Sequence, residues 1–282
     1  MKHFKKDINR HHYGDRNDRP VIISSSNSKI KLVRGLQSRA KDRKGEAAFV
    51  AEGVRLVEEA LAVEWPMEFV LYDQTLSDRG KAIISALHNR TAVDINEVTT
   101  KLMAEISDTE TPQGILAVLK REALPLPTSP TFVILIDQVR DPGNVGTLLR
   151  ASEAMGADTV VLTPGTVDAF SPKVVRAGMG AHFHLPIRHL PWHEIHTYLK
   201  GLPVFLSDSN AQLTLWDADL RQPCALLIGG EAFGASPMGE AIATARITIP
   251  TVGRAESLNA AVAAGILMAE VLRQRYTSGK ER

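Results

Sequence analysis

The sequence predicts an α/β protein whose C-terminal half is a mostly parallel sheet with helices on both faces, preceded by a smaller α/β domain. Three observations support this prediction. Residues 132–136 form a continuous apolar run, which is typical of a strand buried on both faces. Strand-like and helix-like patterns alternate along both halves of the chain. Three prolines within residues 125–130 exclude a helix there and indicate a boundary between the two halves.

The N-terminal half is expected to form a small domain over residues 25–120, preceded by a basic tail at residues 1–24. The tail is polar and shows no hydrophobic periodicity, which favours disorder. Beyond it, apolar residues at helical spacing alternate with short apolar runs that predict strands. The expected elements are a helix over 30–36, a strand over 49–51, a helix over 54–63, a strand over 69–72, a helix over 81–88, and strands over 91–94 and 114–119.

A stiff linker is expected at residues 121–130, and residues 131–282 are expected to form the larger domain. Strand and helix patterns alternate here with a clear rhythm, so the sheet should be parallel and covered on both faces. The expected strands span 132–136, 159–162, 183–187, 204–206, 225–228 and 247–249, and the expected helices span 145–155, 172–178, 192–200, 236–244 and 258–275. In such a sheet, ligands bind where the strands end, at their carboxyl edge.

The composition is that of a globular protein, with 44% hydrophobic and 23% charged residues among 282. No run of about 18 apolar residues exists, so no membrane span is expected. No secretory signal is visible at the N-terminus. The single cysteine, Cys224, lies in an apolar run and is expected to be a buried, inert thiol. Together these features predict a cytoplasmic protein.

The charge is distributed unevenly. Residues 1–50 contain 13 Lys or Arg against 5 Asp or Glu, although the net charge of the whole chain is only +1. This excess favours contact with a polyanion such as nucleic acid, while a solvated tail is the alternative. Aromatic residues make up only 5%, which argues against an extended platform for stacking bases. The candidate phosphate ligands are Lys29, Lys31, Arg34, Arg39, Arg43 and Lys44.

Three loops follow predicted strands and carry the strongest functional signals. The first runs from residue 137 to residue 150. Its Pro142-Gly143 pair predicts a turn, and Asn144 is placed to cap the next helix. Arg150 should lie within the first two turns of that helix. The alternative is an ordinary capped corner with Arg150 on a solvated face.

The second loop spans residues 228–234 and is rich in glycine. Gly229 and Gly230 would let the backbone approach a ligand closely, and Glu231 adds a carboxylate. The pattern matches neither a phosphate-binding P-loop nor a dinucleotide fingerprint.

The third loop, residues 249–259, leads into a helix with unusually small side chains. Ser257 is expected to cap this helix, and Asn259 lies beside it at the mouth. A buried crossover helix is the alternative, but it does not explain the two polar residues at its start.

Together, the three loops resemble the three motifs of the SpoU (TrmH-like) branch of the SPOUT RNA methyltransferases. The resemblance covers residues 131–275 in the family's motif order. Residues 28–120 are similar to the substrate-binding domain, related to ribosomal protein L30e, that often precedes the catalytic domain. One departure is Gly230, where an Asn is common; glycine there removes one possible side-chain contact.

This resemblance implies features that composition and periodicity do not predict. The fold should contain a SPOUT-type trefoil knot, a rare feature in proteins. The cofactor should be S-adenosylmethionine, held in a bent form mainly by backbone groups, and the protein should be a homodimer with its site near the subunit interface. The implied cofactor-binding residues are Gly229, Gly230, Ile249, Pro250, Gly253 and Leu258.

The implied reaction is methylation of a ribose 2′-hydroxyl in RNA. By its match to the family, Arg150 is the expected catalytic residue, either as a general base or as a cation that stabilises the developing alkoxide. The second role is physically easier because a guanidinium is always protonated. Asn144 and Glu231 are expected to orient Arg150 and the substrate, and Ser257 and Asn259 to shape the cofactor loop.

The two-domain layout favours 23S (large-subunit) ribosomal RNA as the substrate, with tRNA as the alternative. Two other readings are a non-catalytic RNA-binding assembly factor on the same scaffold, and a nucleotide-dependent enzyme that acts on a small molecule. Some related enzymes confer antibiotic resistance, and the sequence does not decide this. No metal site is expected, because the closely spaced His182 and His184, like His193 and His196, lack an evident third ligand.

Overall fold

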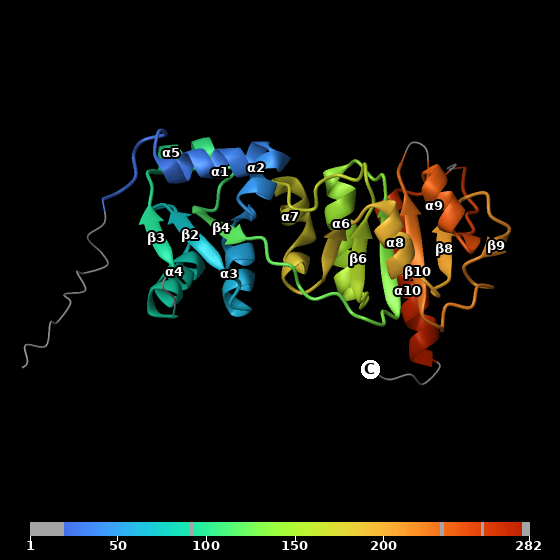
Figure 1. The fold of residues 1–282 in the computed structure, drawn as a ribbon. Helices are drawn as coiled ribbons and strands as arrows, with labels where there is room; N and C mark the ends of the chain where they lie inside the picture. The colour runs from blue at the N-terminus through green and yellow to red at the C-terminus, as the bar shows by residue number, and fades with distance from the viewer. Residues whose placement is uncertain (1–19, 91–92, 232–233, 255–256, 278–282) are drawn as a thin grey trace, which may run out of the picture.

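The computed structural model describes residues 20–90, 93–231, 234–254 and 257–277 (Figure 1). Two sheets lie side by side in an elongated molecule, and the extended segment 121–131 connects them. The smaller sheet has the strand order β1-β4-β2-β3, and the larger one has the order β7-β6-β5-β10-β8-β11-β9. The predicted α/β class is therefore confirmed.

The smaller sheet is mixed. Strand β4 (Ile115–Lys120) lies between β1 (Ala48–Glu52) and β2 (Met67–Tyr72) and is antiparallel to both, while β3 (Asp94–Glu97) is parallel to β2. Its helices are α1 (Ser28–Ser38), α2 (Ala40–Gly45), α3 (Val54–Ala62), α4 (Asp78–Arg90) and α5 (Thr100–Ile106). Buried side chains of α1 and α5 cover one face of the sheet, and those of α3 and α4 cover the other.

The larger sheet is parallel at every strand pair. Its strands are β5 (Phe132–Asp137), β6 (Thr159–Leu162), β7 (Ile187–His189), β8 (Val204–Ser207), β9 (Leu213–Thr214), β10 (Cys224–Gly229) and β11 (Ala245–Thr248). Every residue of β5 is buried, as the apolar run predicts. Cys224 is also buried, which confirms the predicted burial of its thiol.

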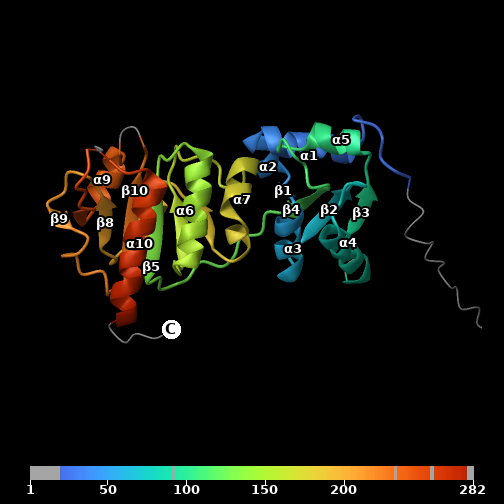
Figure 2. The same cartoon turned by 180° about the vertical axis from the view of Figure 1, so that it is seen from behind.

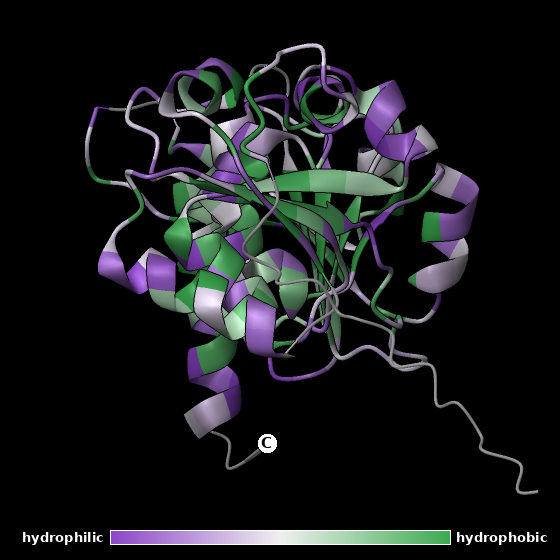
Figure 3. Cartoon of the chain, turned by 90° about the vertical axis from the view of Figure 1, so that its left-hand side faces the viewer, coloured by the Kyte–Doolittle hydropathy of each residue, from purple (hydrophilic) through white to green (hydrophobic). Residues whose placement is uncertain are grey.

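Helices cover both faces of this sheet. They are α6 (Pro142–Ala154), α7 (Pro172–Gly178), α8 (Trp192–Tyr198), α9 (Pro237–Ile242) and α10 (Ala260–Thr277). Helices α6 and α10 pack on one face and α8 on the other, as the two opposite views show (Figures 1 and 2). Figure 3 shows hydrophobic strands at the centre, with hydrophilic residues on the surrounding helices. Among the described helices, none combines the length and apolar composition that crossing a membrane requires.

Several predicted elements differ from the structure. The strand expected over 183–187 is a short 3-10 helix at Ala181–Phe183 followed by β7, because the left-handed residues Met179 and Gly180 end α7 and turn the chain. Helix α5 and strand β9 were not predicted. The strand expected over 91–94 falls partly outside the described residues.

The expectation of a structureless tail through residue 24 is wrong at its last residues, because the Ile22 backbone N–H donates to the Glu97 carbonyl at 2.8 Å. The rest of the expected tail, residues 1–19, lies outside the described residues. The trefoil knot and the domain boundaries stay predictions.

The two sheets share one hydrophobic cluster, built around the segment between β6 and β7. The rings of Phe49 and Phe170 meet edge-on with their centroids 5.2 Å apart, and the Arg121 guanidinium lies 4.3 Å from the Phe170 ring centroid. At the centre of this contact, Arg43 Nε donates to Asp168 Oδ2 at 2.7 Å, and both side chains are largely buried. The smaller unit is thus docked on α7, which in turn packs against α6.

Candidate active site

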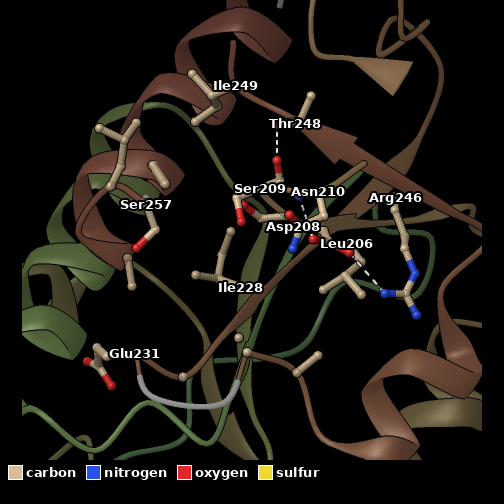
Figure 4. A pocket seen from close by; sticks show the side chains of 18 of the residues that line it. Leu206, Asp208, Ser209, Asn210, Ile228, Glu231, Arg246, Thr248, Ile249 and Ser257 are labelled. Carbon is tan, nitrogen blue, oxygen red and sulfur yellow. Dashed lines mark hydrogen bonds and ion pairs between the residues drawn. The ribbon is translucent and has the colours of Figure 1, made fainter. Parts of the chain in front are cut away.

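A cavity of about 730 Å³ opens at the carboxyl ends of β8, β10 and β11 (Figure 4). Ligands of open parallel sheets bind at this edge, as expected from the sequence. Residues from the second and third predicted loops line the cavity: Gly229, Gly230, Glu231, Ile249, Ser257, Leu258 and Asn259. Pro250 and Gly253 belong to the same chain segment but do not line it.

A hydrogen-bonded network joins all three predicted loops at the edge of this cavity. Asn144 Nδ2 donates to Glu231 Oε1 at 2.7 Å, and Asn259 Nδ2 donates to Asn144 Oδ1 at 3.0 Å. The Asn144 amide therefore uses both of its ends to hold residues that are 87 and 115 positions away. Glu231 and Asn259 remain exposed and can also contact a ligand.

The helix caps beside this network differ from those predicted. Helix α6 is capped by Asp141, whose Oδ1 accepts from the Asn144 N–H at 2.8 Å, so Asn144 lies in the first turn. This frees the Asn144 side chain for the network. At the start of α10, Asn259 Oδ1 accepts from the N–H groups of Ala261 and Val262, so Asn259 takes the capping position expected for Ser257.

Two glycines of the second loop have a steric reason to be glycine. A Cβ on Gly229 would lie 2.4 Å from the backbone of Gly234 and Ala235. A Cβ on Gly230 would lie 2.6 Å from the Gln138 carbonyl oxygen. The loop closes on itself through paired backbone hydrogen bonds between Gly230 and Gly234. The departure from the family pattern at Gly230 is therefore compatible with the local geometry.

Asp137 supports the site from behind, and the sequence analysis did not single it out. Its carboxylate is fully buried at the end of β5 and accepts from the Thr163 hydroxyl at 2.7 Å and the Ser236 N–H at 2.6 Å. The bond from Ser236 ties the start of the first loop to the chain that follows the second loop. A carboxylate directly after an entirely apolar strand was the available signal, because a buried charge needs such partners.

Arg150 does not reach this cavity within its own chain. It lies on α6 and is exposed, and its side chain forms no hydrogen bond or ion pair with another described residue. Helix α6 packs beside α10, which exposes Val262 and Ile266. The structure thus brings Glu231, Ser257 and Asn259 to the cavity, holds Asn144 at its edge through Glu231 and Asn259, and leaves Arg150 on an outer surface.

The predicted phosphate ligands fall into three groups. Lys31 and Lys44 are exposed and form no ion pair with a described residue. Lys29, Arg34 and Arg39 pair with Asp94, Glu105 and Asp42, respectively. The prediction is wrong for Arg43, which is only 4% exposed and is held by Asp168 and by the Leu36 carbonyl at 2.6 Å.

Comparisons with known proteins agree with this geometry. Residues 131–269 match the model of the SpoU rRNA Methylase family, and residues 27–117 match that of the MRM3-like substrate binding domain. The first match contains all three loops around the cavity. The second covers most of the smaller sheet and its helices.

A similar curated protein is the 23S rRNA (guanosine(2553)-2′-O)-methyltransferase RlmP of Bacillus subtilis. It is 35% identical over 250 residues, which cover 88% of this chain and 97% of the relative.

Two solved structures share the fold. The SpoU methyltransferase AviRb from Streptomyces viridochromogenes, in complex with AdoMet, has a TM-score of 0.80 at 27% identity and covers 89% of this chain and 100% of its own. The AdoMet-bound rRNA methyltransferase from Sinorhizobium meliloti has a TM-score of 0.79 at 29% identity, with 90% and 97% covered. The chain therefore belongs to the SpoU rRNA methylase family.

Proposed function

We propose that this protein transfers a methyl group from S-adenosylmethionine to a ribose 2′-hydroxyl of RNA, with large-subunit ribosomal RNA as the substrate. The main support is the Asn144–Glu231–Asn259 network at the edge of a cavity lined by Gly229, Ile249 and Leu258. The choice of ribosomal RNA rests on relatives that carry this activity in their names. We also propose that the protein acts in the cytoplasm, as the sequence predicts.

The cavity fits the proposed cofactor in size and chemistry. Its volume of about 730 Å³ lies within the roughly 300–1,000 Å³ typical of small-molecule sites. Gly229, Ile249 and Leu258 have no polar side chains, so at these positions the cofactor would be recognised by the backbone N–H and carbonyl groups. S-adenosylmethionine, when bound, supplies an electrophilic methyl group on its sulfonium. The chain's own residues then have to position the ribose hydroxyl and to manage its proton.

The network is suited to holding the substrate ribose. Asn144 cannot rotate without breaking a hydrogen bond to Glu231 or to Asn259, so the three side chains keep fixed positions. The second carboxylate oxygen of Glu231 remains able to accept from a hydroxyl. Such fixed polar groups lower the barrier because they are arranged before the reaction begins.

We further propose that the active form is a homodimer. Arg150 faces solvent outside the cavity of its own chain, so only a second chain could bring the Arg150 guanidinium to a reaction site. Val262 and Ile266, 52% and 39% exposed on α10, offer apolar surface beside α6 for this contact. In the dimer, Arg150 of the partner subunit would stabilise the negative charge that develops on the ribose oxygen as the hydroxyl gives its proton to Glu231 or to water.

The experiment that tests the activity is transfer of tritiated methyl from S-adenosylmethionine to ribosomal RNA. Mapping of 2′-O-methyl positions in cells with and without the gene identifies the nucleotide. Transfer to tRNA alone would replace the proposed substrate. Cofactor binding without transfer in a single-turnover assay would favour the alternative, a non-catalytic RNA-binding assembly factor.

A further inference from the structure

The end of the cavity away from the Asn144 network is built by a short loop after β8. Asp208, Ser209 and Asn210 of this loop line the cavity, and so does Arg246 of β11 (Figure 4). Arg246 Nη1 donates to Asp208 Oδ2 at 2.9 Å, and its Nη2 lies 3.5 Å from Glu240 Oε2 on α9. None of these residues was predicted to belong to the site.

Consecutive residues of β11 hold this loop. Beside the Arg246 ion pair, the Asp208 N–H donates to the Ile247 carbonyl at 3.0 Å, and Thr248 Oγ1 donates to the Ser209 carbonyl at 3.3 Å. Asp208 Oδ1 also accepts from the Asn210 N–H at 2.9 Å, which closes the turn. The loop is therefore fixed to β11 along its length and shaped by the Asp208 carboxylate.

Strand β11 leads directly into the third loop. Ile249 follows Thr248, and both line the cavity with Leu258. The residues that hold the Asp208 loop therefore also fix the start of the segment expected to contact the cofactor. A displacement of the loop would change two walls of the cavity together.

The ion pair is poorly suited to a purely stabilising role. The side chains of Asp208 and Arg246 are 20% and 46% exposed, and pairs with this exposure add little to the free energy of unfolding. The Asn210 N–H and the Arg246 guanidinium hold the pKa of Asp208 below its usual value, so the carboxylate stays charged and paired at neutral pH. The Asp208–Arg246 ion pair is therefore formed at neutral pH, although it adds little to the free energy of unfolding.

We propose that Asp208 and Arg246 are positioning residues for the cofactor, because their ion pair fixes the loop that forms the far wall of the cavity. This inference rests on the proposed function, since the ligand is S-adenosylmethionine. It assigns the pair no contact with the reacting atoms. Its effect should therefore appear in cofactor affinity rather than in the methyl-transfer step.

The test uses full-length Arg246→Ala, Asp208→Asn and the double variant, with calorimetric titration of S-adenosylmethionine. Each single variant should raise the cofactor Kd about tenfold, which equals about 1.4 kcal/mol. The double variant should be little worse than either single one, because both remove the same interaction. At saturating cofactor, kcat and the KM for RNA should stay within about twofold. Arg246→Lys should recover part of the affinity, since it keeps a cation near Asp208.

The matched control is Arg221→Ala. Arg221 makes a comparable ion pair with Asp219, with Nε to Oδ1 and Nη2 to Oδ2 both at 2.8 Å, and the Asp219 carboxylate likewise closes a local turn. Arg221 does not line the cofactor cavity. Its variant should keep the wild-type Kd for S-adenosylmethionine.

Three outcomes would overturn the inference. They are an unchanged cofactor Kd in a folded Arg246→Ala protein, an equal loss in Arg221→Ala, and a fall in kcat at saturating cofactor without a change in Kd. Thermal unfolding of each variant establishes that it is folded. A wild-type protein that binds no S-adenosylmethionine would instead refute the proposed function, so the two failures are distinguishable.

Discussion

The contact between the two sheets and the cofactor cavity both join polar side chains from distant parts of the chain, yet they treat these groups differently. At the contact between the sheets, Arg43 and Asp168 are largely buried beside the Phe49 and Phe170 rings. At the cavity, Glu231 and Asn259 stay exposed although they hydrogen-bond to Asn144. The charged groups at the contact between the sheets already have hydrogen-bond partners within the protein. Glu231 and Asn259 at the cavity can still form hydrogen bonds to a ligand.

Electrostatics sharpen this difference. Burial raises the pKa of Asp168, but the Phe170 N–H and the Arg43 and Arg121 guanidinium groups outweigh it, so the pKa lies below its usual value. The carboxylate is therefore committed to its partners. We infer that the contact between the sheets serves stability and that the cavity serves chemistry. Variants at the two places should consequently change different measurements.

The largest effect is expected for Arg150→Ala. Methyl transfer should fall about a thousandfold, equal to about 4 kcal/mol, because the developing alkoxide loses its cation. Thermal stability and the Kd for S-adenosylmethionine should stay near wild type, because Arg150 contacts neither the core nor its own cavity. Near-normal turnover would refute the catalytic assignment.

Mixed dimers of Arg150→Ala and Asn144→Ala subunits test whether the two residues act across the interface. If Arg150 of the partner subunit completes the site, one of the two sites in each mixed dimer carries both intact residues and transfer recovers. Mixed dimers as inactive as each parent would place both residues in the same subunit's site.

Asp168→Asn should act on stability instead. Removing one partner leaves the Arg43 charge buried, which should cost about 3 kcal/mol in the free energy of unfolding, measured with urea. Asp108→Asn is the matched control, because its ion pair with Arg176 joins the same two units but is more exposed. This control should lose less than about 1 kcal/mol. A folded Asp168→Asn protein with greatly reduced turnover would contradict the inference that the contact between the sheets serves stability and not chemistry.

Much of this comparison could be predicted from the sequence, but the partners could not. Glycines and polar residues at three strand ends located the cavity, because parallel strands end at one edge of a sheet. The sequence could not show that Arg43 is buried and ion-paired. Arg43 lies among similar cations at Lys41 and Lys44, and its counterion, Asp168, is 125 positions away. Nor could periodicity reveal that β4 is antiparallel, since a buried strand has the same apolar pattern in either direction.

Acid should weaken the contact between the sheets through His182. Burial lowers the pKa of His182 to about 4, and its Nε2 bonds the Ala169 carbonyl at 2.7 Å. The unfolded chain, with a pKa near 6.5, binds the proton more readily, so stability is full above pH 6.5 and falls as the pH drops towards 4.

Between pH 7 and pH 5 the loss should be about 2 kcal/mol, followed by urea unfolding at each pH. His182→Gln removes the titrating group and should flatten this part of the profile. An equally steep profile in that variant would show that other groups cause the acid sensitivity.

The smallest effect is expected on RNA binding, from the exposed lysines near the buried Arg43. Arg43 is buried against Asp168, whereas Lys44 and Lys31 are exposed and form no ion pair with a described residue. Changing both lysines to Gln should weaken RNA binding about tenfold at low salt, or about 1.4 kcal/mol, and reduce the slope of log K against log salt by about 1.5. Lys200→Gln, an exposed control on the larger sheet's side, should leave the slope unchanged. An unaltered slope in the double variant would place the RNA-binding surface away from α1 and α2.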